Sequence, residues 1–203
     1  MTVQRLALPQ LLSQPLEFVL KPPAFRFYLI HGLALVVSLI VVVWSVWDGQ
    51  TGFGLIHWVG TIFGGTVLLF SFIPKNWDRD QLINLAFDSD QLYLVNGITK
   101  QAVALPRSRV RAVNKGKLPG HDGAIIAFTL DLELDDTELA LVVEIMGTQV
   151  EDRFFIDEHC YRFGFVGNWQ PRQRLLATVA ALAPPELPAP LVVKEEEDDD
   201  DWD

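Results

Sequence analysis

Two long apolar windows constrain this chain more than any other feature of its sequence. Residues 27–47 and residues 53–73 are each 21 residues long and contain no Lys, Arg, Asp or Glu. About 20 apolar residues in a helix, at a rise of 1.5 Å per residue, cross the ~30 Å hydrocarbon core of a bilayer. The sequence therefore predicts two transmembrane helices joined by the five-residue link "DGQTG".

A cleavable signal peptide is the rival interpretation of the first window. That window begins 26 residues into the chain, behind four prolines (Pro9, Pro15, Pro22 and Pro23). Its apolar run exceeds the 7–15 residues usual for a signal peptide, and no Ala-x-Ala cleavage site directly follows it. We therefore favour a membrane anchor.

The charges beside the two windows predict their orientation. Arg5, Lys21 and Arg26 precede the first window and Lys75 and Arg79 follow the second, whereas the link has no basic residue. Lys and Arg near the ends of membrane helices remain on the cytoplasmic side. We expect a multi-pass protein of the bacterial inner membrane with both termini in the cytoplasm.

The second window contains two glycines, Gly60 and Gly64, in a GxxxG pattern. This pattern permits close helix contact, either inside the hairpin or with another protein. Glycine is also common in membrane helices without such a role.

Each window also contains one histidine, His31 or His57, and polar residues within apolar helices are candidates for function. In an antiparallel hairpin the two would lie about 20 Å apart along the membrane normal, so they cannot share a haem iron. Hydrogen bonding at the two membrane interfaces is the expected role.

From residue 82 onward the apolar period changes to two, which is typical of strands. Strands are predicted over residues 82–87, 91–95, 98–105, 109–113, 124–134, 137–145, 151–156 and 161–166, and Asn96-Gly97 is a strong hairpin signal. Residues 170–183 predict a helix with Pro171 in its first turn.

The clearest predicted strand alternates in polarity. It should direct Ile126, Phe128, Leu130, Leu132 and Leu134 inward and Thr129, Asp131 and Glu133 outward. The predicted strand over residues 137–145 should pair with it. The expected architecture is an antiparallel sheet covered on one side, in a small α+β domain.

A resemblance to a known family rests on several segments in order. The stretch "LAFDSDQLYLVNG" precedes a strand with "LPRSRVRAV", and a long hairpin and an amphipathic helix follow. This order resembles the bacterial PH-like domains that follow a two-helix membrane hairpin, and it covers about residues 80–183. The resemblance implies a partly open β-barrel capped by a helix, tethered to the membrane, usually without known catalysis and without fixed functional residues.

The segment 104–120 is basic in a chain whose formal net charge is −10. Its basic residues are Arg107, Arg109, Arg111, Lys115 and Lys117. Anionic lipid contributes about 1 kcal/mol per basic residue near a membrane surface, so these five could bind anionic lipid headgroups or an acidic partner. The alternative is a strand face whose charges balance acids on neighbouring strands.

A Pro-rich linker and an acidic tail occupy residues 184–203. Residues 194–203 contribute −7 to the net charge, and a run of like charges is expected to be disordered. The tail could bind the basic segment, bind a protein partner through Trp202, or aid solubility. It would repel nucleic acid, which we exclude as a partner.

The sequence contains no Gly-rich phosphate loop, HExxH or CxxC motif, and we expect no cofactor and no bound metal. The single cysteine, Cys160, excludes an intramolecular disulfide. With His159 it forms the most enzyme-like cluster, but adjacent side chains in a strand point to opposite faces. A turn between two strands is the preferred interpretation.

Four regions follow from these observations. They are an N-terminal segment (1–26), which either lies in the membrane interface or packs on the β domain, the transmembrane hairpin (27–73), the cytoplasmic PH-like domain (80–183) and the linker with the tail (184–203). We expect a non-enzymatic scaffold, assembly or regulatory protein. The alternatives are an accessory subunit that works through its hairpin and, less favoured, a metal or thiol enzyme around His159 and Cys160.

Overall fold

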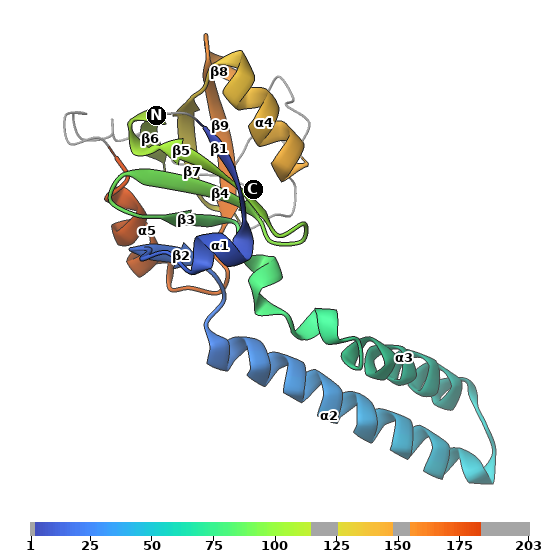
Figure 1. The fold of residues 1–203 in the computed structure, drawn as a ribbon. Helices are drawn as coiled ribbons and strands as arrows, with labels where there is room; N and C mark the ends of the chain where they lie inside the picture. The colour runs from blue at the N-terminus through green and yellow to red at the C-terminus, as the bar shows by residue number, and fades with distance from the viewer. Residues whose placement is uncertain (1–2, 115–125, 148–154, 184–203) are drawn as a thin grey trace, which may run out of the picture.

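The computed structural model of the chain describes residues 3–114, 126–147 and 155–183. These residues form two parts, a hairpin of two helices and an α+β domain from which the hairpin projects (Figure 1). The chain enters the hairpin from the β domain and returns to it, so that strands on both sides of the hairpin belong to one domain.

The hairpin consists of α2 (Ala24–Asp48) and α3 (Leu55–Ser71), joined through the short 3₁₀ helix η1 (Gly49–Thr51). Apolar side chains cover both helices, and many of the large ones are exposed. Among the described residues, α2 alone is long and apolar enough to cross a membrane, and the 17-residue α3 is shorter. The predicted pair of helices is confirmed. The sequence predicted two transmembrane helices, but only one of the two described helices has the length of a membrane span.

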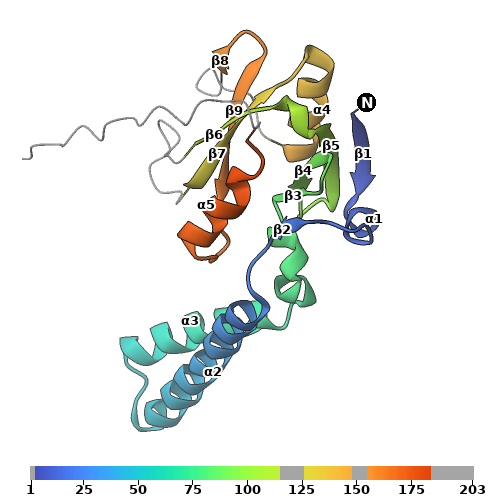
Figure 2. The ribbon, with the colours of Figure 1, turned by 90° about the vertical axis from the view of Figure 1, so that its left-hand side faces the viewer.

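The β domain contains two antiparallel sheets (Figures 1 and 2). The first has the order β1-β5-β4-β3-β2, with β1 (Gln4–Ala7), β2 (Phe18–Leu20), β3 (Leu85–Phe87), β4 (Gln91–Asn96) and β5 (Gln101–Pro106). The second has the order β6-β7-β9-β8, with β6 (Val110–Asn114), β7 (Ile126–Glu133), β8 (Phe155–Asp157) and β9 (Cys160–Val166). The sheets are not closed into a barrel.

The residues before the hairpin are part of the β domain. Strand β1 pairs with β5, and β2 pairs with β3. Between them, α1 (Leu8–Leu12) buries Leu8 and Leu11. Of the two alternatives for the N-terminal segment, packing on the β domain is the one that the structure shows.

The main core lies between the two sheets. Leu92 and Leu94 of β4 and Leu130 and Leu132 of β7 are fully buried in it. Helix α5 (Arg172–Ala180) adds Leu175 and Val179 to the same core, as the predicted amphipathic helix requires. The inward alternation predicted for residues 124–134 is therefore confirmed at Phe128, Leu130, Leu132 and Leu134.

The prediction of sheets covered on one side only is wrong. Tyr93 and Val95, on the other face of β4, are buried in a second core with Leu8 and Leu11 of α1. In the second sheet, Thr129 and Asp131 are predicted to face solvent but are only 2% and 6% exposed, whereas Glu133 is exposed as predicted. An N-terminal helix that returns to the sheet is not visible in the strand periodicity.

The strand predicted over residues 137–145 is also wrong, since this segment is the helix α4 (Asp136–Met146). Asp135 caps its N-terminus by accepting hydrogen bonds from the backbone N–H groups of Thr137 (2.9 Å) and Glu138 (2.8 Å). Gly147 ends it at φ 66°, a left-handed conformation that suits glycine. These capping signals indicate a helix, although the apolar residues of the segment alternate as in a strand.

The turn between β4 and β5 packs against the segment that leaves the hairpin. Two 3₁₀ helices, η2 (Pro74–Trp77) and η3 (Arg79–Leu82), lead from α3 to β3. A Cβ added at Gly97 would collide with the backbone oxygens of Asp80 and Gln81. The predicted Asn96-Gly97 hairpin is confirmed, and its glycine is required for this close approach.

Candidate functional site at the base of the hairpin

A loop between β9 and α5 joins both ends of the hairpin to the β domain. The side-chain amide of Asn168 donates hydrogen bonds to the backbone oxygens of Leu20 (3.2 Å) and Leu82 (2.6 Å). The side-chain amide of Gln170 donates to the backbone oxygen of Lys21 at 3.1 Å. The segment that enters α2 and the segment that follows α3 are therefore held by one loop, which we call the base clamp (residues 167–170).

The base clamp has a strained backbone. Asn168 has φ 46° and Trp169 has φ 59°, and the left-handed region costs a non-glycine residue about 1–2 kcal/mol. The guanidinium of Arg26 donates a hydrogen bond to the backbone oxygen of Trp169 at 2.8 Å. This contact links the first turn of α2 directly to the strained residue.

Aromatic rings gather at the same place. Phe27 is buried, with its ring centroid 4.2 Å from that of His31 and 6.3 Å from that of Trp169. Trp77 stacks on Tyr28 at 6.5 Å, and its indole N–H donates to the backbone oxygen of Ser71 at 2.6 Å. Rings with one polar atom are typical of a membrane–water interface.

A cavity of about 470 Å³ opens beside these rings, between the two helices and η2 and η3. Along the helices its wall is mostly apolar, with His31 and Ser71 as the polar exceptions, and at η2 and η3 it is mostly polar. The lining residues are Phe27, His31, Ala34, Val67, Phe70, Ser71, Lys75, Asn76, Asp78, Gln81, Leu82 and Trp169. The volume lies in the range of small-molecule sites, and we take this cavity with the base clamp as the candidate functional site.

His31 contributes a defined hydrogen-bonding atom to this cavity. Its Nδ1 lies 2.8 Å from the backbone oxygen of Phe27. A carbonyl oxygen only accepts, so Nδ1 carries the proton. In the neutral ring, Nε2 is then an acceptor.

Lys75 and Asp78 are the charged residues of the lining, and they differ in their partners. Asp78 accepts a 2.7 Å hydrogen bond from Lys100, and this partner holds the pKa of Asp78 below its ordinary 3.8. Lys75 is exposed, and within the described part of the chain its ammonium has no ion-pair partner. The cavity therefore offers one uncompensated positive charge.

The basic segment predicted to bind lipid is largely used inside the domain. The guanidinium of Arg107 donates hydrogen bonds to the backbone oxygens of Asp88 (3.2 Å) and Ala181, and lies 5.6 Å from the centre of the Phe87 ring. Arg107 and Arg109 belong to the 3₁₀ helix η4 (Arg107–Arg109). Arg107 thus fastens the end of α5 to the first sheet.

The other two described arginines of this segment pair with neighbouring elements. Arg109 donates a 2.9 Å hydrogen bond to Glu138, whose side chain is 7% exposed. Arg111 of β6 hydrogen-bonds with Cys160. Lys115, Lys117 and Trp202 lie outside the described residues. Acidic partners on neighbouring elements are therefore described for Arg107, which lies 3.6 Å from Glu17, and for Arg109, while binding of lipid or an acidic partner by this segment stays a prediction.

The position of β6 also bears on lipid binding. Both views place β6 in the half of the β domain remote from α2 and α3 (Figures 1 and 2). If the hairpin lies in a membrane, this strand does not face it. The structure brings Lys75, rather than the arginines of residues 107–111, to the base of the hairpin.

Gly60 and Gly64 make their contacts inside the hairpin. A Cβ at Gly64 would lie 2.8 Å from Val42 Cγ2 and 3.1 Å from the backbone oxygen of Ser38, and one at Gly60 would collide with Ser45. Both glycines therefore face α2. The alternative in which they contact another protein is not supported by this geometry.

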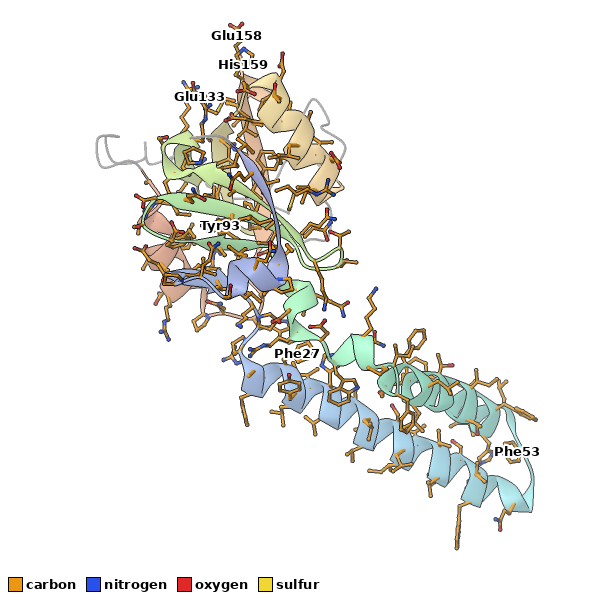
Figure 3. All side chains as sticks on the ribbon, viewed as in Figure 1. Phe27, Phe53, Tyr93, Glu133, Glu158 and His159 are labelled. Carbon is orange, nitrogen blue, oxygen red and sulfur yellow. The ribbon has the colours of Figure 1, made fainter. Side chains whose placement is uncertain are left out.

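His57 lies at the opposite end of the hairpin from His31. Its Nδ1 accepts from the backbone N–H of Gly54 at 3.0 Å, and its Nε2 lies 2.8 Å from Asp48 Oδ2. His31 packs on Phe27 and His57 on Phe53, and Figure 3 shows those two phenylalanines at opposite ends of the hairpin. The prediction that the histidines cannot share a metal is confirmed.

His159 and Cys160 are neighbours in the chain but lie in different surroundings. His159 is exposed at the turn between β8 and β9, with φ 61°, whereas Cys160 is 1% exposed. Burial raises the pKa of the Cys160 thiol, and a hydrogen bond with Arg111 acts in the opposite direction. No group of three His, Cys, Asp or Glu side chains in the described ranges could hold a metal ion.

Sequence reasoning missed the base clamp and the cavity. Asn168 and Leu20, which the clamp joins, are 148 residues apart in the chain. The available signals were the turn-forming sequence "GNWQP" and the placement of Lys75 and Trp77 just after the second window. Neither signal indicates that the two segments meet.

Comparison with protein-family models, with curated proteins and with solved structures finds no match for this chain.

Proposed function

We propose that the protein is a non-enzymatic, membrane-anchored scaffold. Its hairpin spans the inner membrane of a bacterium, and its β domain presents a protein-binding surface in the cytoplasm. The observation that carries this proposal is the base clamp, through which Asn168 and Gln170 bond to the chain on both sides of the hairpin. A domain fastened at both ends of its anchor keeps a fixed orientation to the membrane.

The exposed side chains of both helices support insertion of the whole hairpin. Trp47, Leu55 and Leu69 are 75%, 82% and 72% exposed, which suits contact with lipid. At 17 residues, α3 is about 25 Å long, at the lower limit for a span, and local thinning of the bilayer accommodates such a length at small cost. Basic residues flank the base of the hairpin, whereas the link between α2 and α3 has none. This distribution supports a cytoplasmic β domain.

The architecture of the β domain is compatible with the PH-like resemblance. Two antiparallel sheets enclose a core, and the C-terminal α5 packs on it. Its surface remote from the hairpin carries Glu133, Glu158 and His159 (Figure 3), together with Asp136, whose side chain is 92% exposed. This remote end faces the cytoplasm in the proposed orientation, and we propose it as the surface that meets a protein partner.

Site-specific photo-crosslinking in native membranes tests this proposal. A photoreactive amino acid at Asp136, on the remote end, is expected to give one dominant adduct with a protein. The matched position is Leu69, which is exposed on α3 and is expected to give adducts with lipid only. A protein adduct at Leu69 and none at Asp136 would instead support the accessory subunit that works through its hairpin.

A further inference from the structure

The cavity at the base of the hairpin has an apolar side and a charged side. Ala34 of α2 and Val67 and Phe70 of α3 line the side that continues along the hairpin, while Lys75 and Asn76 of η2 line the other. A ligand that fits both sides is amphipathic. We propose that the cavity binds the headgroup region of one anionic glycerophospholipid with headgroup hydroxyls, of the phosphatidylglycerol type, whose acyl chains extend out of the cavity along α2 and α3.

The charges at the base favour an anionic headgroup. Lys75 has no ion-pair partner among the residues that the structure describes, and the carboxylate of Asp78 is occupied by Lys100. Arg26 lies in the first turn of α2, and Arg79 lies on η3 next to Asp80, so that with Lys75 and Lys100 the basic residues outnumber Asp78 and Asp80 at the base of the hairpin. A lipid phosphate would compensate the ammonium of Lys75.

The neutral polar atoms of the lining favour headgroup hydroxyls. The amide nitrogens of Asn76 and Gln81 already donate to the backbone oxygens of Phe70 and Lys75. Their amide oxygens, together with Nε2 of His31, are acceptors for which the described residues give no intramolecular donor. A glycerol headgroup supplies hydroxyl donors to such acceptors, whereas a choline headgroup supplies none.

This inference rests on the proposed insertion of the hairpin, because a lipid reaches the cavity along α2 and α3 only from a membrane. It does not depend on the protein partner. Membrane insertion without lipid preference would therefore overturn the inference alone, whereas a protein that does not insert would overturn both.

The test is native mass spectrometry of the full-length protein in mild detergent. Phosphatidylglycerol, phosphatidylethanolamine and phosphatidylcholine with identical acyl chains are supplied in equal amounts. One phosphatidylglycerol is expected to remain bound, at least fivefold in preference to phosphatidylcholine. Equal retention of the three lipids would mean ordinary membrane solvation, and a preference for phosphatidylethanolamine would mean that net charge does not select the ligand. Either result overturns the proposal.

Two pairs of variants locate the lipid. Lys75→Gln is expected to lower phosphatidylglycerol retention about fivefold, while Lys21→Gln, a basic residue outside the lining, lowers it less than about twofold. Ala34→Phe is expected to fill the apolar side and lower retention at least tenfold, while Leu33→Phe, exposed on the same helix but outside the lining, leaves it unchanged. Undiminished binding to Lys75→Gln and Ala34→Phe would place the lipid elsewhere and contradict the assignment.

Discussion

Replacing Gly64 with Leu is expected to force α2 and α3 apart, at a cost of about 3 kcal/mol in the stability of the hairpin. The reason is geometric, because even a Cβ at this position would lie 2.8 Å from Val42 Cγ2 and 3.1 Å from the backbone oxygen of Ser38. A backbone atom cannot rotate away as a side chain can. The thermal unfolding of the full-length protein in detergent, followed by circular dichroism, measures the effect.

The neighbouring glycine provides the control. A Cβ at Gly65 would meet no atom within 4 Å, so Gly65→Leu is expected to change stability by no more than about 0.5 kcal/mol. Both variants replace a helical glycine with the same apolar residue. Equal effects at the two positions would mean that the helices do not pack through the face that carries Gly64.

Replacing Arg162 with Leu is expected to destabilise the β domain by about 3 kcal/mol. The guanidinium of Arg162 makes two hydrogen bonds to the carboxylate of Asp131, of 2.7 and 2.8 Å. The Asp131 side chain is 8% exposed, so loss of Arg162 leaves a buried charge with only the Asn114 amide as a described partner. Urea unfolding of the full-length protein in detergent measures this loss.

A surface pair of the same chemistry is the comparison. Arg5 donates a 2.9 Å hydrogen bond to Glu144, but both side chains are about half exposed, at 47% and 60%. Arg5→Leu should therefore cost less than about 1 kcal/mol. Adding Asp131→Leu to Arg162→Leu should restore part of the stability, because it removes the unpaired charge. A double variant no more stable than Arg162→Leu would show that the buried carboxylate is not the cause.

The sequence predicted those elements whose periodicity is clear over many residues. The hairpin helices, β4, β6, β7, β9 and α5 occur where the pattern placed them, within a few residues. Segment 137–145 was misassigned because Leu139, Leu141, Val143 and Ile145 alternate as in a strand, while the same segment buries Glu138, Val142 and Ile145 as a helix. The Asp135 cap and Gly147 would have decided between the two.

The candidate site was beyond local pattern analysis. The segment 107–111 was prominent because its charges are adjacent in the chain, yet Arg107 and Arg109 bind partners within the domain. In the sequence, Lys75 indicates only the orientation of the hairpin, whereas the fold places it in the lining of a cavity between two helices. A charged side chain keeps or lacks an ion-pair partner according to contacts between segments that are distant in the chain. Those contacts cannot be inferred from the local pattern of one sequence.

The proposed topology can be tested directly, because the native Cys160 is buried and gives little background to thiol labelling. Single cysteines are introduced at Gln50, in the link of the hairpin, and at Asp136, on the remote end of the β domain, both of which are exposed. Intact spheroplasts are then treated with a membrane-impermeant maleimide. Labelling of Gln50→Cys in intact spheroplasts, and of Asp136→Cys only after permeabilisation, is the result that the account predicts. Labelling of Asp136→Cys in intact spheroplasts, or protection of Gln50→Cys until permeabilisation, would contradict a hairpin that spans the membrane with its β domain in the cytoplasm.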